Sequence, residues 1–423
     1  MSIWTTLYTG SSGITAFGEG ISVVGDNIAN ISTTGFKGSR ASFEALLGGT
    51  AGNGQREGAG VMMAGPETLF EQGSLNNTGR SLDLAIRGNG FFSVKGPHEG
   101  IEGSFFTRDG RFLLDGNGYI TTGEQLRLQG YAIDPAGARS PVVGDLNVPR
   151  QATGSATTTA DISLNLDARS GTNVWDPANP QTSSNHATSM TVYDSLGTAR
   201  RVDVYFVKTA DNQWEWHGMV DGGDIGQAVG TPVEVGSGSL QFTLSGALDS
   251  QSGSFTADFA GAEPGQTIAF SFGNAIADGG DGRSGTQQQA GSFNFNGLEQ
   301  NGFGAGSLLD VRFSDQGVIS AVYSNGQEHS VGQIAIAMFG QEEKLERSGN
   351  QLFGRTVDSG DPLIDAAGHG SRGSIAAMTL ESSNVDLSKE LVTLIAYQRA
   401  FQSNAKTVTT ADEMLTEVAN LKR

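Results

Sequence analysis

Residues 3–31 read IWTTLYTGSSGITAFGEGISVVGDNIANI, and apolar side chains recur along them every three or four positions. This spacing places the apolar residues on one face of an α-helix. Residues 387–418, LSKELVTLIAYQRAFQSNAKTVTTADEMLTEV, repeat the pattern near the other end of the chain. Because each face needs a partner, we expect the two helices to pack antiparallel on each other or on helices of other copies. The residues predicted to form these faces are Ile3, Leu7, Ile14, Phe17, Ile21, Val24, Ile28, Leu387, Leu391, Leu394, Phe401, Ala405, Val408, Leu415 and Val418.

The first helix is intrinsically weak because five glycines interrupt it, each costing about 1 kcal/mol relative to alanine. These are Gly10, Gly13, Gly18, Gly20 and Gly25. We therefore expect the helix to depend on packing for its stability.

Two asparagines stand near the predicted end of this helix, Asn27 and Asn30. They fit two roles equally well: polar contacts between copies of the chain, or residues tolerated at a helix C-terminus. We include both among the predicted self-assembly residues.

Between the helices the apolar period changes to two, and turn signals such as Asp109-Gly110 and Asn325-Gly326 separate the runs. The fold class predicted is α+β and mainly β, with antiparallel terminal helices in a coiled-coil-like domain and nested all-β barrel or sandwich domains in the middle. The polar stretch at 151–160 and the glycine-rich stretch at 278–285 predict boundaries. The predicted domains are a helical domain (1–30 with 385–423), an extended arm (31–70 with 372–384), an inner β-domain (71–145 with 286–371) and an outer β-domain (146–285).

The charge of the chain is strongly negative and unevenly distributed. The formal net charge is −19, and residues 146–285 hold fifteen acidic against six basic side chains. An acidic surface repels phosphate, which argues against nucleic acid and against anionic membranes as partners.

The composition also excludes several kinds of site and segment. There is no cysteine, hence no disulfide and no thiolate metal site. No run of apolar residues is long enough for a transmembrane helix. The first basic residue is Lys37, so we expect no cleaved secretory signal and no membrane insertion.

Motifs that resemble catalytic or ligand sites are isolated. The stretch Asp278–Gly282 hints at a calcium turn but lacks the repeats of such sites, and a loop is the better interpretation. The segment Trp214–Trp216 could bind sugar, although the packing face of a strand is favoured. We predict no catalytic, metal-binding or cofactor-binding residues.

Five stretches resemble the signature segments of the bacterial flagellar rod and hook axial proteins, in the same order along the chain. They are residues 26–37 (DNIANISTTGFK), 78–92 (TGRSLDLAIRGNGFF), 106–112 (FTRDGRF), 380–387 (LESSNVDL) and 397–406 (YQRAFQSNAK). The length of the chain and its inserted middle, with Tyr193–Gly197 (YDSLG), favour the hook type within this family. A distal-rod-like subunit is the alternative within the family, and a secreted β-rich adhesin or carbohydrate-binding module is the alternative outside it.

The resemblance implies a non-enzymatic structural subunit without cofactors. Copies of such a subunit self-assemble into a curved, hollow helical tube that joins the rod to the filament and transmits torque as a universal joint. The implied partners are other copies, the rod, the hook cap, the hook–filament junction proteins and the flagellar type III export apparatus. The implied location is the flagellar hook outside the cell.

Overall fold

The computed structural model describes residues 3–50 and 56–421, which form two units. Unit 1 comprises Met1–Pro149, Asp310–Val322 and Glu328–Arg423, and unit 2 comprises Arg150–Leu309 and Tyr323–Gln327. Strands predominate in both, and the two long helices belong to unit 1. The predicted fold class, mainly β with terminal helices that pack together, is confirmed.

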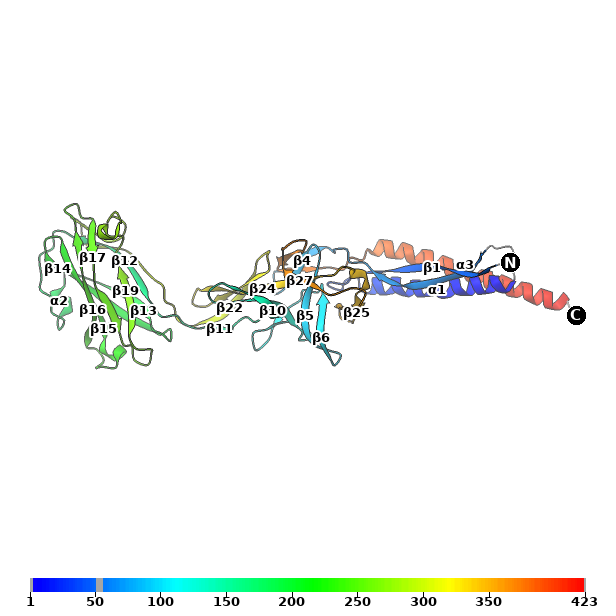
Figure 1. The fold of residues 1–423 in the computed structure, drawn as a ribbon, viewed down its shortest axis with the longest axis horizontal. Coiled ribbons are helices and arrows are strands. Elements are labelled where there is room, and N and C mark those ends of the chain that lie inside the picture. Colours follow the sequence, from blue (N-terminus) through cyan, green and yellow to red (C-terminus); the bar gives the residue numbers. More distant parts are fainter. Residues whose placement is uncertain (1–2, 51–55, 422–423) are drawn as a thin grey trace. The chain divides into compact units, whose positions relative to one another are not determined.

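The terminal helices lie side by side and run antiparallel (Figure 1). Helix α1 spans Ile3–Ala29 and helix α3 spans Leu387–Leu421. The N-cap of α3 is Asp386, whose Oδ1 accepts hydrogen bonds from the backbone N–H groups of Ser388 (2.8 Å) and Lys389 (3.3 Å). Among the described helices, none combines the length and the apolar character needed to cross a bilayer.

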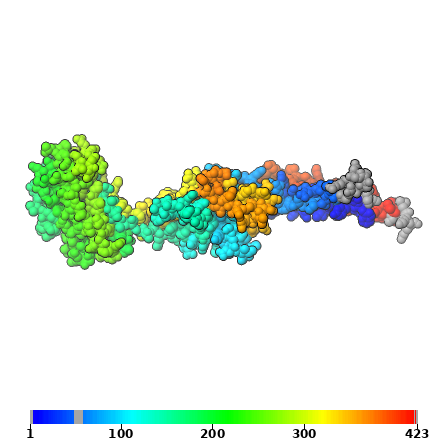
Figure 2. Space-filling view, in the orientation of Figure 1, coloured from blue at the N-terminus to red at the C-terminus, as the bar shows by residue number. Residues whose placement is uncertain are grey.

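Residues predicted as part of an extended arm form a long antiparallel hairpin. Strands β1 (Ser39–Thr50) and β2 (Arg56–Thr68) pair from Ser39–Thr68 onward, with Arg40 opposite Glu67. The hairpin lies along α1, and both are blue in Figures 1 and 2. Successive side chains of the hairpin point to opposite faces, and one of these faces packs against the helices. A linker would not need such a packing face.

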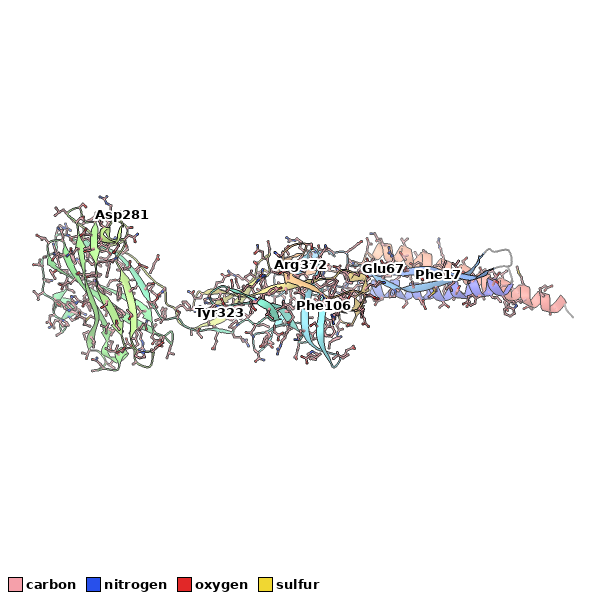
Figure 3. The ribbon with its side chains drawn as sticks, viewed as in Figure 1. Phe17, Glu67, Phe106, Asp281, Tyr323 and Arg372 are labelled. Atoms are coloured by element: carbon pink, nitrogen blue, oxygen red, sulfur yellow. The ribbon has the colours of Figure 1, made fainter. Side chains whose placement is uncertain are left out.

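The remainder of unit 1 is built around one antiparallel sheet with the strand order β23-β24-β9-β5-β6-β26-β25. Strand β10 pairs with β9, β27 with β24 and β7 with β8, while β28 pairs with β4 and β29 with β3. The bounds are β3 (Leu75–Asn77), β4 (Leu84–Arg87), β5 (Phe91–His98), β6 (Ile101–Thr107), β7 (Leu113–Leu114), β8 (Ile120–Thr121), β9 (Arg127–Ile133), β10 (Arg139–Asp145), β23 (Val318–Tyr323), β24 (Glu328–Met338), β25 (Glu346–Arg347), β26 (Leu352–Gly354), β27 (Leu363–Ala366), β28 (Ser374–Ala377) and β29 (Thr379–Glu381), with a 3₁₀ turn at Glu342–Lys344. Phenylalanines fill the core, where Phe106 (Figure 3) meets Phe339 edge-on at 4.8 Å.

Unit 2 is a second β-structure with its own core. Its strand order is β13-β14-β15-β16-β18-β19-β12-β20, with β17 on β16 and β21 on β12. Strand β11 pairs with β22, whose residues from Asp310 onward belong to unit 1. The bounds are β11 (Gln151–Ala152), β12 (Thr159–Asp167), α2 (Pro180–Ser183), β13 (His186–Tyr193), β14 (Ala199–Ala210), β15 (Gln213–Asp221), β16 (Pro232–Phe242), β17 (Leu248–Gln251), β18 (Ser254–Ala257), β19 (Gln266–Ser271), β20 (Gln287–Gln289), β21 (Asn294–Gln300) and β22 (Gly306–Phe313), with 3₁₀ turns at Gly222–Ile225 and Ile276–Asp278.

Two of the predicted domain boundaries differ from the observed pairing. The outer β-domain was expected to end at residue 285, but β20 and β21 both pair with β12, so this sheet continues to Gln300. The glycine-rich stretch 278–285 is a turn inside unit 2. Residues 372–384, expected in the arm, contain β28 and β29, whose backbones pair with β4 and β3. These strands are too short for sequence periodicity to detect.

Both tryptophans of the suspected sugar-binding segment are enclosed in the core of unit 2. Trp214 and Trp216 are 0% and 1% exposed. Their indole N–H groups donate to Gln288 Oε1 and to the Ser252 carbonyl, each at 3.1 Å. The prediction of a packing face is confirmed, since neither ring face is open to a ligand.

The loop that hinted at a calcium turn is held together by its own hydrogen bonds. Asp281 (Figure 3) accepts from the backbone N–H groups of Arg283 (2.9 Å) and Ser284 (3.3 Å). These donors lower the pKa of Asp281. The Asp281 carboxylate therefore organises the backbone of this loop.

The turn between β13 and β14 is organised by the buried carboxylate of Asp194. The side chain is 1% exposed and accepts from the backbone N–H groups of Leu196 (3.0 Å) and Thr198 (2.9 Å) and from Arg200 Nε (3.1 Å). Burial alone would raise the pKa of Asp194, but these donors favour the carboxylate more strongly, so its pKa lies below the ordinary value.

Replacement of Asp194 by asparagine is therefore expected to destabilise unit 2 by about 1.5–3 kcal/mol at pH 7, because charged hydrogen bonds are lost. A depressed folded-state pKa stabilises above the unfolded-state pKa near 4, and this contribution disappears as the pH falls through the folded-state pKa. Urea unfolding followed by tryptophan fluorescence should show a deficit that shrinks below pH 4. The exposed Asp211→Asn is the control, and equal effects of the two substitutions would contradict the role of Asp194.

Candidate assembly site

Small residues line the contact between α1 and α3. Gly10 and Gly13 are buried, and a Cβ atom added to either would lie 2.7 Å from a side-chain atom of Val408 or Asn404, respectively. Glycine at these positions allows the backbones of the helices to approach closely. Two of the glycines that weaken α1 as an isolated helix are therefore the residues that permit its pairing.

An aromatic cluster joins both helices to the hairpin. Phe17 of α1 (Figure 3) lies 5.3 Å from Phe43 of β1 and 5.9 Å from Tyr397 of α3, measured between ring centroids. Phe43 and Tyr397 meet edge-on at 5.6 Å. Such pairs contribute about 0.5–1.5 kcal/mol each beyond their buried area. The helices and the hairpin thus form one packed body.

Hydrogen bonds of the Asn27 side chain connect the C-terminal end of α1 to the start of the hairpin. Its side chain is 2% exposed, donates to the Ser39 carbonyl (2.7 Å) and accepts from the Ser39 N–H (2.8 Å). Asn30 donates to the backbone carbonyl of Asp26 at 3.0 Å, as expected for a residue that ends a helix. Both amides form hydrogen bonds within the chain, and a part for Asn27 and Asn30 in contacts between copies stays a prediction.

A fully buried ion network connects the segment after α1 and the segment before α3 to the β-sheet. Glu381 accepts from Lys37 Nζ at 2.6 Å and from Arg108 Nη1 at 3.2 Å, and the side chains of Lys37 and Glu381 are 0% exposed. Lys37 follows α1 in sequence, Glu381 ends β29 shortly before α3, and Arg108 follows β6. One carboxylate therefore holds three distant segments together.

The charges of this network are costly to bury, and the carboxylate of Glu381 stabilises both cations. Desolvation lowers the pKa of Lys37, and the attraction of Glu381 opposes that effect. Further bonds complete the network, since Lys37 Nζ donates to the Glu71 carbonyl (2.7 Å) and Arg108 Nη2 to that of Gly88 (2.9 Å). Removing Glu381 would leave Lys37 and Arg108 in the interior without the carboxylate that both contact.

The predicted helix-face residues fall into three groups. Half-buried are Leu7, Ile14, Phe17, Ile21, Ile28, Asn30, Leu394, Phe401, Ala405, Val408 and Leu415, while Val24 and Asn27 are buried. The third group, Leu387, Leu391 and Val418, is 43%, 44% and 55% exposed. The side chain of Ile3 lies outside the described residues.

The exposure of Val418 is explained by the register of the helices. Gly10 faces Val408, Gly13 faces Asn404 and Gly20 faces Tyr397. Continuing this register leaves Val418 beyond the first turn of α1. Helix α3 is the longer of the two, with 35 residues against 27.

Several large apolar side chains of the helices have little cover within the chain. Trp4 and Tyr8 on α1 are 72% and 61% exposed, and Val392, Ile395 and Met414 on α3 are between 50% and 69% exposed. Apolar surface gathered in this way marks a site for association.

The buried ion network and its neighbouring amides were not predicted as functional residues. Lys37, Arg108 and Glu381 each lie inside a stretch that carried the family resemblance. That coincidence was the available signal, because a buried charge pair cannot be inferred from periodicity. Asn384 belongs to the same region, and its side chain accepts from the Gly38 N–H (2.8 Å) and donates to the Leu69 carbonyl (2.8 Å).

Family models of flagellar axial proteins match four parts of the chain. They are the flagellar basal body rod protein (residues 7–37), the D1 domain of the flagellar hook protein FlgE/F/G (85–164), the D2 domain of the flagellar basal body protein FlaE (132–303) and the C-terminal segment of the basal body rod FlgEFG proteins (377–421). The matched segments include α3, most of α1, and Lys37, Arg108 and Glu381 of the ion network, whereas the β1–β2 hairpin lies outside them.

Similar proteins cover nearly the whole chain. The flagellar hook protein FlgE of Escherichia coli (strain K12) is 36% identical, over 97% of this chain and 98% of that protein. The FlgE proteins of Salmonella typhimurium (97% and 98% covered) and Treponema pallidum (99% of each covered) are 35% and 32% identical. A solved structure of Helicobacter pylori FlgE2 aligns with 73% of this chain and 100% of its own, at 15% identity and a TM-score of 0.47. On the strength of the full-length sequence relatives, this chain belongs to the family of bacterial flagellar hook proteins.

Proposed function

We propose that copies of this chain polymerise through their terminal helices and the β1–β2 hairpin into a curved, hollow tube of the flagellar hook. The observation that carries this proposal is the exposed apolar surface on otherwise well-packed helices, at Trp4, Tyr8, Leu391, Val392 and Ile395. The family is structural rather than enzymatic. An open helical polymer needs contacts between two different patches, and this surface offers more than one.

The domains would take different parts in such a tube. The helices would form its inner wall and unit 2 its outer part, as the notably acidic composition of unit 2 suits contact with solvent. Weak, wet contacts between acidic domains can slide while the tube rotates, so the tube could transmit torque and bend at the same time. The buried network around Glu381 would keep the helices fixed on the sheet under this load.

The remaining partners follow from the proposed position of the tube. It would begin at the rod, carry the hook cap while it grows, and end at the hook–filament junction proteins. Subunits would travel through the flagellar type III export apparatus and assemble outside the cell.

The test uses the purified full-length chain at increasing concentration, examined by negative-stain electron microscopy and sedimentation. Curved tubes are expected above a critical concentration. The double substitution Trp4→Ser/Tyr8→Ser should raise that concentration at least about tenfold, because burying one large apolar side chain contributes about 1.5–3 kcal/mol. Folding should be unaffected, since both side chains are exposed in the single chain.

The matched control is Val174→Ser/Val229→Ser in unit 2, at positions that are 88% and 86% exposed. It removes exposed apolar surface outside the helices and should leave the critical concentration unchanged. A wild-type chain that stays monomeric at every concentration would refute the proposal.

A further inference from the structure

One line along α3 carries side chains whose character changes in an ordered way. Val392, Arg399, Lys406 and Glu413 are each seven residues apart, and two turns of helix take close to seven residues, so the four lie in a row. From the N-terminal to the C-terminal end of α3, the side chains of the row change from apolar (Val392) to basic (Arg399 and Lys406) and then to acidic (Glu413). Glu417 extends the acidic end by one turn.

This row faces away from α1. The residues that face α1 form a different series with the same spacing, Leu394, Phe401, Val408 and Leu415, and these are half-buried. Members of the outer row are all exposed, with Val392 at 69%. The row therefore plays no part in joining the helices of one chain.

The charges of the row are not used within the chain. In the described ranges 3–50 and 56–421, none of Arg399, Lys406, Glu413 and Glu417 forms an ion pair. Exposed charges elsewhere in unit 1 do pair, for example Arg40 with Glu67 at 2.8 Å. Beside Val392, Leu391 and Ile395 are 44% and 50% exposed, so the apolar end also lacks full cover.

We propose that this row is the surface on which α3 of a neighbouring copy packs, parallel to the first helix and displaced along it by 11 to 14 residues. This inference rests on the proposed function, because a tube of equivalent copies orients all its α3 helices alike. The lower limit, 11 residues, is the separation of Lys406 from Glu417 along the helix. The upper limit, 14 residues, is the separation of Arg399 from Glu413. At 1.5 Å per residue they correspond to roughly 16–21 Å.

The order of charges along the row selects this arrangement over the alternatives. Parallel helices without displacement would place Arg399 opposite Arg399 and Glu413 opposite Glu413, and like charges across an interface are strongly disfavoured. The proposed displacement brings the acidic end of one copy to the basic middle of the next. Each copy then presents one half of the row to the copy on either side, so the contact never closes and can repeat without limit.

Exposed ion pairs contribute little affinity, so the row would chiefly set the register of neighbouring helices. The exposed apolar residues at the N-terminal end of the row and elsewhere on the helices would supply most of the attraction between copies. An alternative occupant is a different protein, and another possibility is that the row stays solvated in the tube. Both are outcomes of the experiment below.

The decisive experiment uses two charge-reversed variants of the full-length chain, R399E/K406E and E413K/E417K. In each variant alone, like charges meet at every contact, and we expect the critical concentration for tubes to rise at least about tenfold. In an equal mixture, the two variants alternate with complementary charges, and we expect tubes at close to the wild-type concentration. Sedimentation and negative-stain electron microscopy at about 0.15 M salt are the readouts.

The control is Lys389→Glu, a reversal on α3 outside the row, which should assemble like the wild type. Circular dichroism and thermal unfolding establish that each variant folds, as expected for substitutions at exposed positions. If a variant does fold poorly, the neutral pair R399Q/K406Q and E413Q/E417Q replaces it, with a smaller rise in critical concentration expected for each.

Failure of this inference is distinguishable from failure of the proposed function. Wild-type protein that forms no tubes would overturn both. Wild-type tubes together with variants that assemble alone as readily as the wild type would overturn the inference and leave the proposed function standing. A mixture that assembles no better than its components would do the same, and would point to a different occupant of the row.

Discussion

Substitution of Glu381 by glutamine is expected to lower the free energy of unfolding of unit 1 by about 3–5 kcal/mol, the usual cost of leaving a buried charge without its partner. Lys37 and Arg108 would both lose the carboxylate that they contact at 2.6 and 3.2 Å. Chemical unfolding followed by circular dichroism at pH 7 measures the effect. The exposed Glu346→Gln serves as the matched control, with an expected change within about 0.5 kcal/mol.

The pH dependence of this variant tests the cause. Burial already lowers the pKa of Lys37 in the folded protein, and the loss of Glu381 removes the attraction that opposes this shift. Between the lowered folded-state pKa and the ordinary value of 10.5, the unfolded chain binds more protons, so the stability of the variant should rise with pH in that range. The double variant Glu381→Gln/Lys37→Met should be less destabilised than the sum of its single substitutions. Strict additivity would contradict the network.

Replacement of Gly10 by leucine is expected to separate α1 from α3 and to abolish tube formation. Leucine favours a helix over glycine by about 1 kcal/mol, so helix propensity alone predicts stabilisation. Its Cβ would however lie 2.7 Å from Val408 Cγ2, and the rest of the side chain would have to displace α3. Overpacking of this kind costs about 1–3 kcal/mol. Thermal unfolding and electron microscopy provide the readouts.

Gly25→Ala is the matched control on the same helix, because no atom lies within 4 Å of its added Cβ. It should stabilise α1 by up to about 1 kcal/mol and leave assembly intact. If Gly10→Leu and Gly25→Ala shift the melting temperature in the same direction, the close approach of the helices at Gly10 does not matter for their pairing.

The parts of the fold that rest on local periodicity could be predicted from the sequence. The spacing of Leu394, Phe401, Val408 and Leu415 predicted the inward face of α3, and the Asp-Gly and Asn-Gly turns predicted a mainly β middle.

The parts that rest on distant pairing could not be predicted in this way. Lys37 and Glu381 are 344 residues apart, and nothing local in either stretch identifies the partner. Strands β20 and β21 join their sheet through β12, more than a hundred residues earlier in the chain, so a glycine-rich turn looked like a boundary. The benefit of Gly10 and Gly13 in α1 could not be predicted for a related reason, since it appears only when α3 lies against them.

Ser155 and Phe303 form an isolated antiparallel bridge in unit 2, and this pairing has an evolutionary consequence. Because the backbones of these two residues are neighbours, residues 156–302 form an insertion whose two ends lie next to each other. An insertion of this kind can be enlarged, trimmed or exchanged for another without forcing any change in the segments that flank it.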